Sequence, residues 1–164
     1  MSSFNRRLFL LSATAFVGAC GFTPVYGPNG GARPLLNNVR VDEPTDNGTY
    51  FLTRELEDRL GRGTGAEKFA LSLALTTEQR SVGKTVAQIT SRYDIVGRVT
   101  YDLRDTTSNK VITSGEADSF TGYSATGTTV SELAAETDAY ERLMVILADR
   151  IVSQLQAYAT SNQL

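Results

Sequence analysis

The chain has 164 residues, of which 41% are hydrophobic and 21% charged, and its formal net charge at pH 7 is −2. This length suits one domain with a single hydrophobic core. The slightly acidic balance argues against a nucleic-acid-binding protein, which needs a basic surface. The sequence has no histidine, so the Ser-His-Asp and Cys-His arrangements of hydrolases are absent.

Residues 1–19 predict a targeting segment. Arg6 and Arg7 give it a positive start, and the apolar run Leu8–Ala19 follows. That run is too short to span a bilayer as a helix. The paired arginines suit export by the general secretory route or by the twin-arginine route, and both end in the periplasm. Residues 1–19 are therefore expected to be a signal peptide of the lipoprotein type.

Cys20 is the only cysteine, and it follows Val17, Gly18 and Ala19. This order resembles the bacterial lipobox, in which the signal is cut before a cysteine that then carries acyl chains such as palmitate. A disulfide is excluded because no second cysteine exists. Two or three acyl chains anchor a protein durably at a membrane. Residue 21 is Gly, where Asp would imply retention in the inner membrane, so we expect an anchor in the inner leaflet of the outer membrane.

Removal of the signal peptide would leave 14 basic and 18 acidic side chains, a net charge of −4. All four prolines lie within the first 44 residues. Residues 20–34 therefore predict a lipidated N-terminus and a flexible tether rich in Pro and Gly. Residues 35–164 are expected to form a single domain.

Residues 35–41 predict the first strand of that domain. A helix over about 49–60 follows, with Asp46 or Asn47 as its N-cap and Gly61 as its C-cap. One face of this helix is apolar because leucines recur every four residues. These are Leu52, Leu56 and Leu60.

The middle of the chain predicts three strands. Residues 68–79 alternate apolar with small or polar side chains, residues 80–85 indicate a turn, and residues 86–105 give the longest strand signal. A polar turn at 106–109 leads to a third strand over 110–124. The face of the longest strand that is expected to be apolar carries Tyr93, Ile95, Gly97, Val99, Tyr101 and Leu103.

The C-terminal part predicts a long helix. Thr129 and Glu132 fit a capping box with Thr129 as N-cap. Apolar residues recur at helical spacing from Leu133 to Tyr158, which gives a helix of about 28 residues and roughly 42 Å. The expected fold is α+β in the order β-α-β-β-β-α, with two helices packed on one face of a four-stranded, mostly antiparallel sheet.

Residues 80–110 carry six basic and three acidic side chains. One interpretation is a solvated strand face with cross-strand ion pairs. The other is a face that binds phosphates or an anionic lipid headgroup. No spacing indicates a metal site, a cofactor site or a nucleophile, so we expect no metal, no cofactor, no catalytic residue and no enzymatic activity. The catalytic alternative that spacing leaves open is a hydrolase that uses a pair of carboxylates.

Several stretches together resemble the LptE family of lipopolysaccharide-assembly lipoproteins, in the form found in alphaproteobacteria. The start Cys-Gly-Phe-Thr-Pro-Val-Tyr-Gly at residues 20–27 is similar to the start of the family after lipidation. The remaining stretches are similar to its central strand and its strand-to-helix ending. They are 91–94 and 101–103, then 123–124, 138–143 and 147–151.

The resemblance implies a non-catalytic protein that plugs the lumen of the outer-membrane β-barrel LptD, assists its assembly and binds lipopolysaccharide. It also implies lipopolysaccharide contacts by basic residues near the sheet loops. Charge and position nominate Arg80, Lys84 and Arg92 for that role. The alternative is a lipid-anchored periplasmic regulator of an envelope enzyme such as a cell-wall synthase.

Overall fold

The computed structural model describes residues 24–84, 90–162 and 164. The expected signal peptide, the lipobox and Cys20 therefore lie outside the described residues. The elements in chain order are η1 (Arg33–Leu35), β1 (Val39–Val41), α2 (Asn47–Leu60), β2 (Phe69–Lys84), β3 (Thr90–Asp105), β4 (Val111–Ser124) and α3 (Thr129–Asn162).

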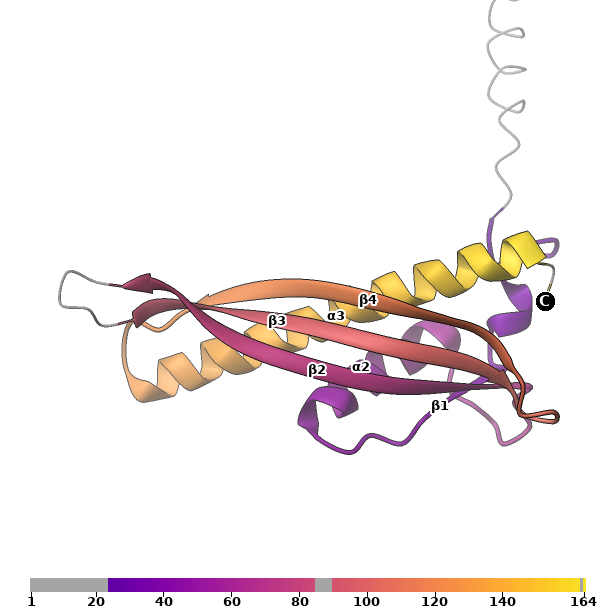
Figure 1. The fold of residues 1–164 in the computed structure, drawn as a ribbon, viewed down its shortest axis with the longest axis horizontal. Helices are drawn as coiled ribbons and strands as arrows, with labels where there is room; N and C mark the ends of the chain where they lie inside the picture. Colours follow the sequence, from indigo (N-terminus) through magenta and orange to yellow (C-terminus); the bar gives the residue numbers. More distant parts are fainter. Residues whose placement is uncertain (1–23, 85–89, 163) are drawn as a thin grey trace, which may run out of the picture.

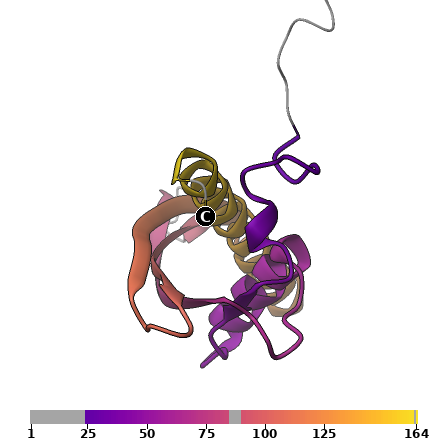
Figure 2. The same ribbon diagram turned by 90° about the vertical axis from the view of Figure 1, so that its right-hand side faces the viewer.

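The four strands form one sheet in the order β1-β2-β3-β4. β1 runs parallel to β2, and the β2–β3 and β3–β4 pairs are antiparallel. Both α-helices lie against the same face of the sheet, which curves around them (Figures 1 and 2). The predicted α+β architecture is confirmed.

The core lies between this inner face and the two helices. On β3, Ile95, Val99 and Leu103 are fully buried, whereas Arg98 and Thr100 point to the outer face and are exposed. The predicted alternation along this strand is therefore confirmed. The predicted leucines of α2 are also fully buried, and α3 supplies most of the remaining core. Its fully buried large side chains are Leu143, Met144, Leu147, Ile151 and Leu155.

Of the two candidate N-caps of α2, Asp46 is the cap, and the predicted C-cap Gly61 is confirmed. The Asp46 carboxylate accepts a hydrogen bond from the Thr49 backbone N–H at 2.8 Å, and the Thr49 hydroxyl accepts one from the Asp46 backbone N–H at 2.9 Å. These two bonds form a capping box. Gly61 ends the helix with φ of +86°, a backbone conformation that favours glycine.

The start of α3 differs from the prediction. The helix begins at Thr129, and the cap is Thr128, whose hydroxyl accepts a hydrogen bond from the Ser131 backbone N–H at 3.3 Å. The Ser131 hydroxyl donates back to the Thr128 carbonyl oxygen at 2.8 Å, so Glu132 is not the partner in the cap. The helix is 34 residues long, six more than expected.

Two strand boundaries also differ from the prediction. β1 covers only Val39–Val41, because the residues before it form η1 and a turn. Residues 80–84, expected as a turn, continue β2 and pair with β3, with register shifts between Ser81 and Lys84. Pairing with the neighbouring strand outweighs the local turn preference of this stretch.

The described part of the predicted tether, residues 24–34, is folded onto α3. Ala32 is fully buried, and the Tyr26 hydroxyl accepts a hydrogen bond from the Gln156 side chain at 2.8 Å. This segment therefore enters the domain beside the C-terminal end of α3. The β2–β3 hairpin lies at the opposite end of the molecule (Figure 1).

Candidate functional site

The nominated basic residues lie at the hairpin end of the sheet. Arg80 is opposite Asp94 in the β2–β3 register, and Arg92 is opposite Gly83. The alternation of side chains along each strand places Arg80 and Arg92 on the outer face, away from the helices. Lys84 is the last residue of β2, and its side chain lies outside the described part.

The arginines of the outer face pair with carboxylates. Arg80 and Arg92 remain exposed, with side-chain accessibilities of 58% and 64%. The hydrogen bond from the Arg80 guanidinium lowers the pKa of Glu78. The ion pairs are Arg80–Glu78 at 2.7 Å, Arg92–Asp94 at 3.9 Å, Arg98–Glu116 at 3.2 Å and Arg104–Asp102 at 3.3 Å.

These pairs reduce the positive excess that is counted along residues 80–110. Glu78 and Glu116 lie outside that stretch of sequence, yet they neutralise Arg80 and Arg98 across short distances. The interpretation as a solvated face with ion pairs is therefore supported, but only Arg98–Glu116 joins two strands, whereas the other three pairs each lie within one strand. Exposed ion pairs contribute little to the free energy of unfolding. A phosphate that accepts two hydrogen bonds from a guanidinium group can therefore displace the carboxylate that is paired with that arginine.

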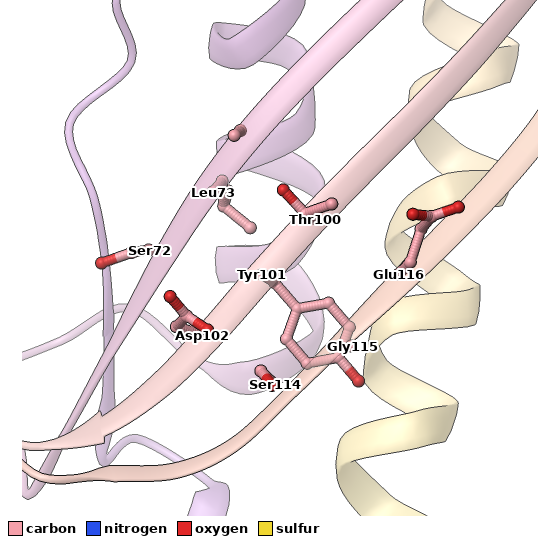
Figure 3. Close-up of a pocket in the computed structure, with 9 residues that line it drawn as sticks. Ser72, Leu73, Thr100, Tyr101, Asp102, Ser114, Gly115 and Glu116 are labelled. Carbon is pink, nitrogen blue, oxygen red and sulfur yellow. The ribbon is translucent and has the colours of Figure 1, made fainter.

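The outer face also has a shallow hollow of about 550 Å³ across three strands (Figure 3). Its lining is mostly small or polar, with Leu73 and Tyr101 as the larger residues, and it includes two carboxylates but no basic side chain. Such a lining offers no complement to an anionic lipid. The polar lining residues are Ser72, Thr100, Asp102, Ser114 and Glu116.

A second hollow, of about 560 Å³, opens on the helix side of β2. We call it the β2 groove. It lies between the first turn of α2, the middle of β2 and the first half of α3. The acidic side chains of Asp46 and Glu136 lie next to its apolar walls. The walls are formed by Phe51, Leu75, Leu133 and Tyr140, and the polar lining residues include Thr77, Thr137, Asp46 and Glu136.

An aromatic and amide cluster on the inner face lies nearer the hairpin. The rings of Tyr93 and Tyr123 stack with centroids 5.5 Å apart, and the Gln79 side chain donates a hydrogen bond to the Tyr123 hydroxyl. Burial raises the pKa of Tyr123, and the nearby carboxylates of Glu136 and Glu132 raise it further. The stacked rings and this hydrogen bond link β2, β3 and β4 near the hairpin end of the sheet.

The described residues contain no group of three or more His, Cys, Asp or Glu side chains that could hold a metal ion. Within the same part of the chain, no helix is both long and apolar enough to cross a membrane. The sequence did not reveal the β2 groove, because its walls come from three elements whose relative positions depend on the fold.

Comparisons with solved structures place the fold among bacterial lipoproteins. A lipoprotein of Caulobacter crescentus CB15 is 23% identical, with a TM-score of 0.67 over 79% of this chain and 98% of that chain. Rare lipoprotein B of Shewanella oneidensis is 12% identical, with a TM-score of 0.55 over 73% and 92%. A minor lipoprotein of Acinetobacter baumannii is 17% identical, with a TM-score of 0.55 over 76% and 94%. These likenesses concern the fold.

Comparison with curated protein sequences gives no match. The sequence model of the LptE family, described as lipopolysaccharide-assembly, matches residues 36–155. This match covers well over half of the chain, including β1 to β4, α2 and most of α3. The chain therefore belongs to the LptE family.

Proposed function

We propose that this protein is an outer-membrane lipoprotein that binds and plugs the LptD β-barrel and assists lipopolysaccharide assembly at the cell surface. The observation that carries the proposal is the family match over residues 36–155. The described surfaces support binding: the chain presents grooves and exposed ion pairs, and its described residues offer no candidate metal site. A non-enzymatic role agrees with the complete lack of histidine in the sequence.

The proposed anchor is Cys20, acylated after cleavage behind Val17, Gly18 and Ala19. Residue 24 is the first described residue, and the chain there lies beside the C-terminal end of α3. An anchor attached four residues earlier would hold that end of the domain near the membrane surface. It would also keep the protein beside a membrane-embedded partner at a high effective concentration.

The proposed lipopolysaccharide contacts are Arg80, Lys84 and Arg92 at the hairpin end. They lie where β2 ends and β3 begins, at the end of the molecule opposite to the entry of the tether (Figure 1), and α3, about 51 Å long, runs between the two ends. Guanidinium groups bind phosphates through two parallel hydrogen bonds. The exposed Arg80 and Arg92 have the chemistry needed to bind an anionic glycolipid at the far end of the domain.

Depletion of this protein in its own bacterium tests the proposal. We expect the amount of correctly assembled LptD in the outer membrane to fall, and newly made lipopolysaccharide to disappear from the surface. Unchanged LptD and surface lipopolysaccharide, together with altered cell-wall synthesis, would support the regulator of an envelope enzyme instead.

A further inference from the structure

The edge of the sheet at β4 is covered by α3. Four side chains of this helix donate hydrogen bonds to backbone carbonyl oxygens of β4, and these bonds run along nearly the whole strand. Because these carbonyl oxygens already accept hydrogen bonds from α3, the β4 edge is poorly able to pair with another strand. The bonds are Arg142 to Gly122, Arg150 to Asp118, Gln154 to Glu116 and Tyr158 to Ile112.

The opposite edge, at β2, is covered only at its beginning. The Phe69 N–H donates to the Asn38 carbonyl oxygen at 2.9 Å, and the Leu71 carbonyl oxygen accepts from the Asp42 N–H at 3.0 Å. The backbone groups of the odd-numbered residues of β2 thus point away from β3. β1 ends at Val41, so β2 beyond Leu71 has no neighbouring strand on this side among the described residues, although the first turn of α2 lies beside Leu75.

Thr77 and Gln79 lie in this uncovered part of β2. Their register with β3 is regular, so their backbone N–H and C=O groups also point outward. Within residues 24–84, 90–162 and 164, none of these four groups makes a backbone hydrogen bond, and both residues are exposed. A row of unpaired backbone N–H and C=O groups along a strand edge can form hydrogen bonds with the backbone of an extended polypeptide.

The β2 groove lies beside this edge, on its inner side. Leu75 and Thr77 belong to both, and Phe51, Leu133 and Tyr140 form the facing walls. A strand added to β2 would direct alternate side chains toward the inner face, into the groove. Asp46 and Glu136 at the groove favour a partner that carries a basic residue next to its apolar ones.

We propose that the β2 edge from Leu75 to Gln79, together with the β2 groove, docks an extended segment of a partner protein. That segment pairs through its backbone and places alternating apolar side chains, flanked by a basic residue, in the groove. Backbone pairing then supplies affinity and the groove supplies specificity. The inference needs no assumption about which protein supplies the segment.

A second copy of this chain fits the site less well. An antiparallel pairing of two β2 edges about Gln79 would place Ser81 and Gly83 of the second copy opposite Thr77 and Leu75. These residues are too small and too polar to fill apolar walls. The register shifts between Ser81 and Lys84 would also interrupt the pairing.

Residue-resolved amide hydrogen exchange tests the proposal on the full lipoprotein, measured once in isolated outer membranes and once after purification alone in detergent. We expect the amides of Thr77 and Gln79 to exchange at least about tenfold more slowly in the membranes. The turn amides of 106–109 serve as the reference because they lie far from the edge. Equal exchange of Thr77 and Gln79 in both preparations would overturn the proposal.

Two matched substitutions on α3 separate docking from folding. Leu133 and Val130 are both largely exposed, at 63% and 79%, but only Leu133 lines the groove. Leu133→Glu should restore fast exchange at Gln79 in membranes, whereas Val130→Glu should not. Thr77→Pro, which removes an outward N–H and leaves the β3 pairing intact, should act like Leu133→Glu. Protection that survives both Leu133→Glu and Thr77→Pro would contradict the proposal.

The test also distinguishes the alternatives. Protection in the detergent sample that grows with protein concentration would indicate a second copy and overturn the partner proposal. The presence of LptD is measured separately by mass spectrometry of the membrane complex. If LptD is present but the amides of the β2 edge are unprotected, docking at β2 is refuted and the proposed function stands. If these amides are protected but LptD is absent, the proposed function is refuted and docking at β2 stands.

Discussion

Tyr101 of β3 donates a hydrogen bond from its hydroxyl to the side-chain oxygen of Gln154 on α3, at 2.8 Å. The amide nitrogen of Gln154 donates in turn to the Glu116 carbonyl oxygen on β4, at 3.0 Å. Through these two hydrogen bonds, Gln154 connects α3 to both β3 and β4. It needs Gly115, because a Cβ there would lie 2.5 Å from the Tyr101 hydroxyl oxygen.

Gly115→Ala should therefore destabilise the protein. The added methyl group forces the Tyr101 ring to move, which breaks the bond to Gln154, and overpacking of this kind costs about 1–3 kcal/mol. Urea unfolding monitored by circular dichroism measures the loss. Ser114→Ala, on the outer face, is the control and should be near neutral. If Gly115→Ala unfolds at the wild-type urea concentration, the packing described here is wrong.

The free energy of unfolding should depend on pH through Glu55. Its carboxylate accepts a hydrogen bond from Arg59 at 2.8 Å, and this bond lowers its pKa from the ordinary 4.5. A lowered folded-state pKa gives stability that is present above pH 4.5 and is lost as the pH falls through the lower value. Glu55→Gln should show a smaller loss of stability below pH 4.5 than the wild type.

Asp58→Asn is the control for that measurement, because Asp58 is exposed on the same helix. This variant should keep the acid-dependent loss of stability that comes from Glu55. A Glu55→Gln variant with the full acid-dependent loss would show that the Glu55–Arg59 bond is not responsible.

The capping box of α2 makes a separate prediction. Asp46→Ala removes the acceptor for the Thr49 N–H and should cost about 1 kcal/mol, whereas Asp46→Asn retains an acceptor and should cost much less. Thermal unfolding of both variants checks this order. Equal losses would mean that the side chain acts through its charge and not as a cap.

The basic hairpin end is tested by lipopolysaccharide binding. Arg80→Ala combined with Arg92→Ala should weaken binding of purified lipopolysaccharide about tenfold, because two charge-assisted contacts are removed. Adding Lys84→Ala should weaken it further. Arg62→Ala is the control, since Arg62 is also highly exposed but follows α2. Unchanged affinity in the triple variant would remove these three residues from the proposed contact.

The anchor is tested by mass spectrometry of the intact protein. Wild-type protein from membranes should begin at Cys20 and carry the mass of two or three acyl chains. Cys20→Ala should yield a precursor with its signal uncut or a product without lipid. An unmodified Cys20 in the wild type would refute the proposed anchor.

The parts of the fold that depend on short stretches of sequence could be predicted. The alternation from Tyr93 to Leu103 gave the buried face of β3, and the Asp46 and Gly61 signals gave the two ends of α2. Each of these signals acts within one turn or one strand. The order of elements and the cover of one sheet face followed from them.

The errors arose where distant segments decide the structure. Residues 80–84 contain turn-forming residues, but β3 pairs with them and keeps them in a strand. Ala32 is buried only because residues 24–34 pack on the far end of α3. The local charge count missed Glu116, which neutralises Arg98 from the neighbouring strand. Thr128 and Thr129 are adjacent and chemically alike, so the sequence could not identify the cap.

The central claim is the association with a large outer-membrane barrel. The most direct measurement is affinity purification of the tagged, lipidated protein from outer membranes in mild detergent, with mass spectrometry of its partners. The account predicts a stoichiometric barrel of the LptD type. Recovery of the lipoprotein alone, or with a cell-wall synthase in place of a barrel, would contradict it.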